Sequence, residues 1–243
     1  MIPKIFAHRG AKSAAPENTL PAFEKALEMG VDGVELDVQC SKDNQLMVIH
    51  DFTLDKTTSG SGLVSDFTAS ELAQLDAGSH FGVEFAGVGV PTLPQILDRL
   101  QGQCHVNIEI KSQDRSGGPE VESVLALIQE RNLYDEVLIS SFNPMTLIKT
   151  RWLDKQISIG LIYREPLPDY LSNAWLGPII DPQALHPHSR LVETQLINFA
   201  HERNLAVNTW TVNDTEEARR LAGLGVQIII SDVPVQLMSG LAV

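Results

Sequence analysis

Short hydrophobic runs recur along the chain, and amphipathic stretches separate them. The runs are bounded by turn residues and rich in Val, Ile and Leu, which is typical of buried β-strands. The stretches at 19–29, 120–131 and 192–203 repeat hydrophobic residues with the 3.6-residue period of a helix. This alternation predicts parallel β/α units and therefore an α/β fold. The predicted strands cover residues 5–8, 33–39, 46–50, 105–111, 137–141, 158–163, 206–212 and 228–231.

The length of the chain fits one barrel of the TIM type. Such a (β/α)8 barrel typically has about 250 residues, and this chain has 243. Residues 184–186 are the weakest strand and our candidate for the sixth barrel strand; a stretch punctuated by Pro and Gly at 166–182 precedes them. We predict that residues 1–243 form a single (β/α)8 barrel domain, with an open doubly wound sheet as the alternative.

The segment at about 51–90 interrupts the alternation. It is rich in Gly, Ser and Thr and contains only a short helical pattern, at 69–75. The loops that follow the strands of a TIM barrel form its catalytic face. We therefore predict a small insertion over the barrel mouth, after the second β/α region.

The chain is acidic, and this narrows the choice of partners. Its formal net charge of −13 gives a surface that repels phosphate backbones, which disfavours nucleic acid and anionic membranes as partners. No run approaches the ~18 apolar residues of a membrane span, so we expect a cytoplasmic protein without stable membrane association. An oligomeric state is not predicted. Cys40 and Cys104 lack C-x-x-C spacing, and we expect buried free thiols.

Acidic side chains share one face of two predicted strands. Alternate residues of a strand point to the same face, so Glu35 and Asp37 lie together while their neighbours are aliphatic. The same holds for Asn107, Glu109 and Lys111. If both faces point into a barrel, the three converging carboxylates either take up protons or hold a cation, and oxygen ligands suit Mg²⁺ or Ca²⁺ better than zinc. The alternative is a solvated strand face.

Two histidines and two cations accompany these acids. His8 and His50 each stand at the end of a predicted strand. At equivalent strand ends beside a carboxylate cluster, they are candidates for a general acid and a general base. Arg9 offers a planar donor fork for phosphate oxygens, and Lys111 offers a point charge. The alternative for Lys111 is a salt bridge with Glu109.

Other residues give weaker indications. Phe142 and Trp210 end strands and are candidates for packing on a substrate, although aromatic residues at such places are as often part of a core. His186 and His188 resemble a zinc pair but lack further ligands, so we favour loop structure for them. Asp232 precedes a Pro, and we interpret it as the cap of a final short helix.

Short motifs follow one another along nearly the whole chain. They are His8-Arg9-Gly10, Pro16-Glu17-Asn18-Thr19, Glu35-Leu36-Asp37, His50-Asp51, Asn107-Ile108-Glu109-Ile110-Lys111, Ser140-Ser141-Phe142, Trp210-Thr211-Val212-Asn213 and Ser231-Asp232-Val233-Pro234. In this order and at these spacings, the chain resembles the glycerophosphodiester phosphodiesterase family, which includes cytosolic bacterial enzymes. Residues 163–182 match the family poorly, and Ser231 stands where the family often has Thr.

The resemblance implies a barrel enzyme that hydrolyses glycerophosphodiesters to sn-glycerol 3-phosphate and an alcohol. It implies Glu35, Asp37 and Glu109 as ligands of one divalent cation, Mg²⁺ or Ca²⁺. It also implies His8 and His50 as the acid/base pair. The expected mechanism has the glycerol 2-hydroxyl attack phosphorus to give a cyclic phosphate, which water then opens.

The resemblance also places Arg9 and Lys111 on the phosphate group. Two alternative functions stay open from the sequence. A phosphodiesterase acting on lysophospholipids needs an apolar rim, for which the insertion offers only scattered Phe residues, at positions 52, 67, 81 and 85. A non-catalytic barrel that binds a phosphodiester has no need of a paired acid and base beside a metal.

Overall fold

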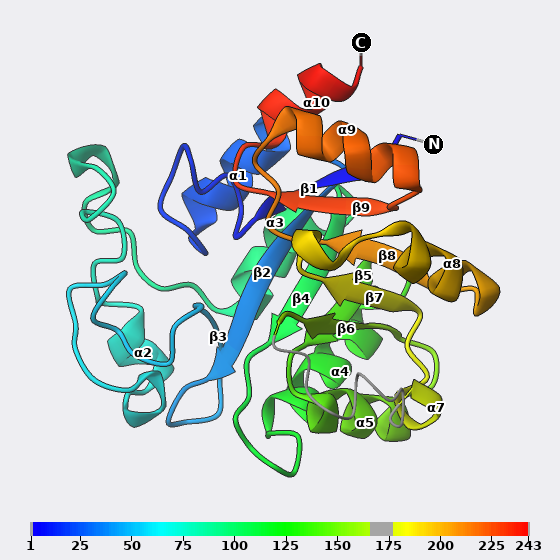
Figure 1. The fold of residues 1–243 in the computed structure, drawn as a ribbon. Coiled ribbons are helices and arrows are strands. Elements are labelled where there is room, and N and C mark those ends of the chain that lie inside the picture. Colours follow the sequence, from blue (N-terminus) through cyan, green and yellow to red (C-terminus); the bar gives the residue numbers. More distant parts are fainter. Residues whose placement is uncertain (1, 166–176, 243) are drawn as a thin grey trace.

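The computed structural model describes residues 2–165 and 177–242, and in this part of the chain nine strands form one sheet (Figure 1). Eight of these strands run parallel, and the sheet closes because β1 pairs with both β2 and β9. The predicted (β/α)8 barrel is therefore confirmed. The barrel strands are β1 Lys4–His8, β2 Gly33–Cys40, β4 His105–Ile110, β5 Val137–Ser141, β6 Ser158–Tyr163, β7 Ala184–Pro187, β8 Ala206–Thr209 and β9 Ile228–Ser231.

The strand predicted at 46–50 does not belong to the barrel. It is β3, Leu46–Val48, and it runs antiparallel to β2 with Val38 paired to Val48 and Cys40 to Leu46. The prediction of a parallel strand was wrong here. The hydrophobic pattern of a strand is the same whether the strand runs parallel or antiparallel to its neighbour. The sixth strand of the barrel is β7, which confirms the candidate at 184–186. The stretch predicted at 166–182 lies partly outside the described residues.

Helices alternate with the barrel strands and lie around them. The predicted helices at 19–29, 120–131 and 192–203 correspond to α1, α4 and α8. Capping follows the sequence: Thr92 and Gln95 form a capping box at the start of α3, and Asn132 ends α4 in the left-handed conformation. No described helix combines the length and the apolar character of a membrane span. The helices are α1 Leu20–Glu28, α3 Leu93–Leu100, α4 Glu120–Arg131, α5 Pro144–Leu153, α7 Gly177–Ile180, α8 Thr194–Glu202, α9 Thr215–Leu224 and α10 Pro234–Leu241.

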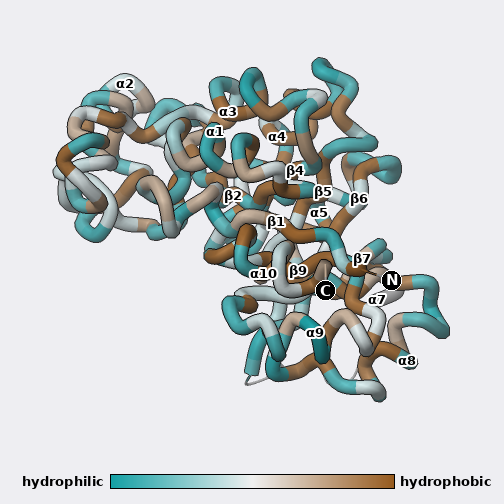
Figure 2. The backbone as a smooth tube through the Cα atoms, turned by 90° about the horizontal axis from the view of Figure 1, so that it is seen from above, coloured by the Kyte–Doolittle hydropathy of each residue, from teal (hydrophilic) through white to brown (hydrophobic). Residues whose placement is uncertain are grey.

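The two faces of strands β2 and β4 have different chemistry. Aliphatic residues of β2 and β4 belong to the main hydrophobic core, which they form together with the helices: Val34, Leu36, Val38, Val106, Ile108 and Ile110. The alternate residues are polar or charged and point into the barrel. Figure 2 shows the resulting pattern, in which hydrophobic segments concentrate along the central strands and hydrophilic segments on the periphery. The predicted division into an aliphatic outer face and a polar inner face is confirmed.

Two glycines on the inner face leave room for large side chains. A Cβ at position 33 would lie 2.5 Å from the Phe6 ring, and a Cβ at position 160 would lie 2.4 Å from His186 Nε2. Both separations are below any normal contact. Gly33 and Gly160 therefore allow Phe6 and His186 to fill the barrel interior.

The segment between β3 and α3 has a small core of its own. Figure 1 shows it projecting from the barrel beside β2 and β3. It contains η1 Val64–Asp66, α2 Ala69–Leu72 and η2 Val83–Phe85, and Thr68 and Glu71 form a capping box at the start of α2. Its hydrophobic cluster consists of Met47, Ile49, Leu54, Val64, Leu72, Ala77 and Val90.

Candidate active site

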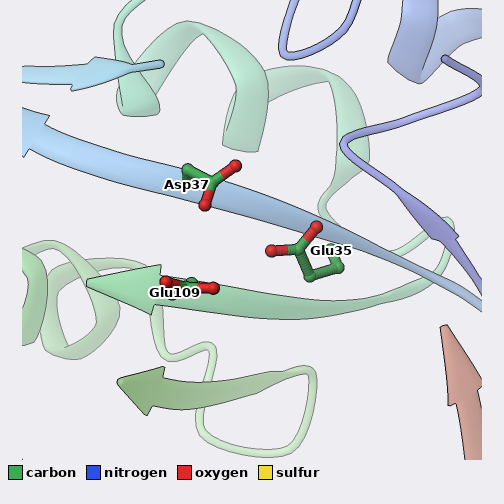
Figure 3. Close-up of side chains that lie close together, drawn as sticks. All are labelled: Glu35, Asp37 and Glu109. Carbon is green, nitrogen blue, oxygen red and sulfur yellow. The ribbon is translucent and has the colours of Figure 1, made fainter. Parts of the chain in front are cut away.

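Two neighbouring strands bring three carboxylates together. The register of β2 and β4 pairs Asp37 with Glu109, and Glu35 with Asn107. Asp37 and Glu109 are therefore direct neighbours on the inner face, and Glu35 lies two residues earlier on the same face. One oxygen from each carboxylate lies within 4.8 Å of the other two (Figure 3). The structure thus gathers the three residues predicted as metal ligands toward the C-terminal end of the barrel.

Burial and like charge make this cluster unfavourable without compensation. Burial, followed by the charges of Asp37 and Glu109, raises the pKa of Glu35 well above its ordinary value. Burial and Asp37 also raise the pKa of Glu109 to about 7. Among the described residues, Asp37 Oδ1 has no hydrogen-bond partner. A divalent cation fits this donor set, because three buried carboxylates, one with an unpartnered oxygen, are the hard ligands that Mg²⁺ and Ca²⁺ prefer.

Arg9 connects the cluster to the loop after β1. Its backbone adopts φ +58°, in the left-handed region, and its N–H donates to Glu35 Oε2 at 3.0 Å. The guanidinium Nη1 donates to Glu17 Oε1 at 2.7 Å, and Nε lies 3.3 Å from Asp37 Oδ2. Burial lowers the pKa of Arg9, but the surrounding acids raise it by a larger amount. Arg9 therefore remains cationic.

Lys111 supplies the second cation of the site. Its Nζ donates to Glu109 Oε1 at 2.8 Å and lies 3.9 Å from Asp37 Oδ1. The salt bridge considered as an alternative for Lys111 is therefore present. Burial lowers the pKa of Lys111, but Glu109 and Asp37 outweigh that effect and raise it.

His8 ends β1 and points one ring nitrogen at the acids. Its Nε2 lies 3.9 Å from Glu35 Oε2, and its Nδ1 lies 2.7 Å from Asp232 Oδ1. The interpretation of Asp232 as a helix cap was wrong, because α10 has Val233 as its N-cap residue and no side-chain cap. The carboxylate of Asp232 instead faces His8 across neighbouring strand ends.

His50 reaches the site by a different route from His8. It follows the antiparallel β3, so the two histidines do not stand at equivalent strand ends, which corrects the expectation from the sequence. The hairpin returns toward β2, where Ile49 N donates to Asp37 O at 3.0 Å. The Gln39 side-chain amide donates to the carbonyl oxygens of Ile49, His50 and Asp51 at 2.8 to 3.0 Å and fixes this turn.

The ring of His50 is hydrogen-bonded to the next residue. Its Nδ1 lies 2.5 Å from Asp51 Oδ1. Burial lowers the pKa of His50, and the positive charges of Arg9 and Lys111 add to this effect. The carboxylates of Asp37 and Asp51 act in the opposite direction and favour the protonated ring.

Both histidines, Arg9, Glu35 and Glu109 line one cavity of about 160 Å³ at the C-terminal end of the barrel. A second cavity, of about 180 Å³, includes Lys4 and His105 and lies at the opposite end, away from the acidic cluster. Active sites of TIM barrels lie at the C-terminal end. The first cavity is lined by His8, Arg9, Glu35, His50, Asn107, Glu109, Phe142, Ile162, His186, Trp210, Thr211 and Ile230.

Aromatic rings form one wall of this cavity. Phe142 and Trp210 pack edge to face with ring centroids 5.4 Å apart, and Lys111 Nζ lies 5.8 Å from the centre of the Phe142 ring. His188 also packs edge to face with Trp210, with ring centroids 5.3 Å apart. His186 is buried in β7 and bonded to Asn208 at 2.9 Å, so the interpretation of His186 as a loop residue was wrong.

Comparison with known proteins agrees with this geometry. The model of the glycerophosphoryl diester phosphodiesterase family matches residues 8–236. The chain belongs to this family. A glycerophosphodiester phosphodiesterase of Caldanaerobacter subterraneus subsp. tengcongensis is 38% identical over 237 residues, covering 97% of this chain and 96% of the relative. One of Bacillus altitudinis is 36% identical over 239 residues, covering 95% of each.

A solved structure shows the same fold with a ligand bound. It is an Oleispira antarctica phosphodiesterase in complex with the product sn-glycerol-3-phosphate, with a TM-score of 0.91 and 28% identity. The match covers 100% of this chain and 98% of that one. The family assignment made from sequence motifs is confirmed, and with it the assignment to the phosphodiester hydrolases.

Sequence reasoning missed three residues that support the candidate site. They are Asn18, Gln39 and Asp232. Asn18 Nδ2 donates to Asp37 Oδ2 at 2.9 Å. The two-residue period identifies Gln39, because it continues the inner face of Glu35 and Asp37. Nothing local identifies Asp232, because its partner His8 is 224 residues away.

Proposed function

We propose that this member of the family hydrolyses glycerophosphodiesters to sn-glycerol 3-phosphate and an alcohol, with one divalent cation, Mg²⁺ or Ca²⁺, at Glu35, Asp37 and Glu109. The observation that carries the proposal is the buried carboxylate cluster with both histidines on one cavity. A single-domain enzyme fits this arrangement, since residues from both ends of the chain and from the hairpin form the site. The product bound to the Oleispira antarctica phosphodiesterase supports the same substrate class.

The cation, when bound, supplies positive charge that offsets the phosphate and favours ionisation of a hydroxyl. The residues of the chain provide the rest. Arg9 and Lys111 hold the phosphate, because their cationic N–H donors bind its negatively charged oxygens. Phe142 and Trp210 pack against the apolar side of the substrate and exclude water.

Proton transfers in this mechanism run through the two histidines. His8 takes the proton of the glycerol 2-hydroxyl while the hydroxyl oxygen attacks phosphorus. The protonated ring of His50 donates a proton to the leaving alcohol. In the second step, His50 takes a proton from the water that opens the cyclic phosphate, and His8 returns its proton to the 2-oxygen. Both histidines therefore regain their initial states.

Release of glycerol 3-phosphate from glycerophosphocholine tests this proposal. Metal-stripped protein should be inactive, should regain activity with Mg²⁺ or Ca²⁺, and should lose it in the His8→Ala variant. Lack of product with every metal would contradict the proposed reaction.

The leaving group separates the two histidine roles. Replacing the alcohol by p-nitrophenol removes the need for an acid, because the phenolate leaves without protonation. The defect of His50→Ala should then shrink, while the defect of His8→Ala should persist. The reverse pattern would exchange the two assignments.

Lysophospholipids are a second candidate substrate class. The observation in their favour is apolar exposure in the insertion, where Val83 is 87% exposed and Phe81 40% exposed. Matched acylated and deacylated substrates distinguish the two classes. A preference for acylated substrate that Val83→Ser abolishes would favour lysophospholipids.

A further inference from the structure

Asp232 lies beside His8 because two strand ends meet there. The register of β1 and β9 pairs Ala7 with Ser231, so the next residues, His8 and Asp232, stand side by side. Asp232 Oδ1 lies 2.7 Å from His8 Nδ1. The contact therefore joins the first and the last strand of the barrel at its C-terminal end.

Other donors fix the Asp232 carboxylate. Asn213 Nδ2 donates to its Oδ2 at 2.8 Å, and Asn213 Oδ1 accepts from the Asp232 backbone N–H at 2.9 Å. Lys12 Nζ lies 3.2 Å from Oδ1. Burial raises the pKa of Asp232, but the hydrogen bonds and charges of His8, Asn213 and Lys12 lower it well below its ordinary range. Asp232 is therefore ionised at neutral pH.

An ionised carboxylate can only accept a hydrogen bond, and this decides where the His8 proton lies. The proton must be on Nδ1, which leaves the lone pair of the neutral ring on Nε2. Nε2 is the nitrogen on the side of Glu35 and the cavity. The orientation and the tautomer together present a proton acceptor to the site.

We propose that Asp232 is the positioning residue of His8, holding it in the Nδ1–H tautomer so that Nε2 takes the proton of the attacking hydroxyl. The proposal rests on the proposed function of His8 as base. The proton moves from the substrate oxygen to Nε2 while Asp232 stays ionised and balances the charge of the imidazolium. Asn213 and Lys12 act through Asp232 by fixing its two oxygens.

Asp232→Asn tests the role with little change in shape. Both carboxylate oxygens accept hydrogen bonds, so the amide nitrogen of Asn must face either His8 or Asn213. Facing His8, it reverses the tautomer and places the proton on Nε2. We expect kcat to fall about 10²- to 10⁴-fold, with KM and metal affinity unchanged. Asp232→Glu should restore part of the loss.

Asp214→Asn is the matched control. Asp214 lies nearby and caps α9 by accepting from Glu217 N, the structural role that the sequence indicated for Asp232. This control should keep normal kcat. Wild-type kcat in Asp232→Asn would overturn the proposal.

The ¹⁵N shifts of the His8 ring, assigned with the His8→Ala variant, give a readout without turnover. We expect Nδ1–H in the wild-type protein and a shift toward Nε2–H in Asp232→Asn. An Nε2–H tautomer in the wild type would overturn the proposal. Absence of phosphodiesterase activity in the wild type would instead refute the proposed function, while the spectrum still decides the tautomer.

A p-nitrophenyl ester of glycerol 3-phosphate sharpens the assignment further. Its leaving group needs no acid, so the defect of Asp232→Asn should persist if Asp232 supports the base. A defect confined to substrates with alkyl alcohols would place Asp232 on the acid side and overturn the proposal.

Discussion

The two ends of the barrel both contain buried cations, but the groups that face these cations differ. At the N-terminal end, Arg151 is 9% exposed, and its two terminal nitrogens donate to Gln183 Oε1 and to the carbonyls of Asp154, Lys155, Ile157 and Asp181. At the C-terminal end, Arg9 and Lys111 face a cluster of carboxylates that repel one another.

This difference separates stability from function within one fold. The acceptors around Arg151 are neutral carbonyl oxygens, so its hydrogen bonds join two loops without bringing like charges together. Burial and the charge of Asp37 raise the pKa of Glu35 and of Glu109 at the mouth, and Asp37 Oδ1 has no hydrogen-bond partner in the described part of the chain. Polar groups with unused binding capacity destabilise the free protein and become favourable when a cation and a substrate bind.

The largest expected effect is the loss of turnover in His50→Ala. General acid–base groups typically contribute about 10²- to 10⁴-fold, and His50 lies on the cavity at the mouth. We expect such a fall in kcat for glycerophosphocholine, with the melting temperature within a few degrees of wild type. A variant with near-normal kcat would show that the hairpin does not provide the acid.

Arg151→Met should have the largest effect on stability. Removing the guanidinium leaves buried carbonyl groups without donors, and we expect a loss of about 2–4 kcal/mol in the free energy of unfolding. Activity per folded molecule should stay normal. Arg99→Met is the control, because Arg99 forms only an exposed pair with Glu24. Equal stability losses in both variants would remove the contrast between the barrel ends.

Glu109→Gln should weaken the binding of Mg²⁺ or Ca²⁺ about tenfold or more. The metal-free variant should be at least as stable as the metal-free wild type, because the substitution removes one of three like charges. Thermal unfolding with and without metal measures both effects. A metal-induced rise in melting temperature as large as that of the wild type would exclude Glu109 as a ligand.

His186 gives the smallest effect and a test by pH. Burial lowers the pKa of His186 to about 3, so the folded protein keeps it neutral while the unfolded chain protonates near the ordinary value. Its contribution to stability is therefore present above about pH 6.5 and is lost as the pH falls toward 3. In His186→Gln, the decline in stability between pH 6 and pH 4 should be less steep by up to about 1.4 kcal/mol per pH unit. Parallel curves would show that His186 has the same pKa in the folded protein and in the unfolded chain.

Local patterns predicted most of the fold because the barrel repeats a simple unit. The period of two is enough to separate the inner acids Glu35 and Asp37 from the outer aliphatic residues of the same strand. The helical period located α1, α4 and α8 within two residues of their ends. The direction of β3 was not predictable in this way, because pairing partners and not local period decide whether a strand runs parallel.

The sequence by itself determined the alternation of strands and helices, the family and the residue types of the site, since these depend on short-range pattern and chemistry. Only the tertiary structure decided which groups meet. The β2–β4 register placed Asp37 beside Glu109, the hairpin returned His50 to the level of Asp37, and barrel closure set Asp232 against His8. Such contacts depend on closing the sheet between distant parts of the chain, and no local sequence pattern encodes that closure.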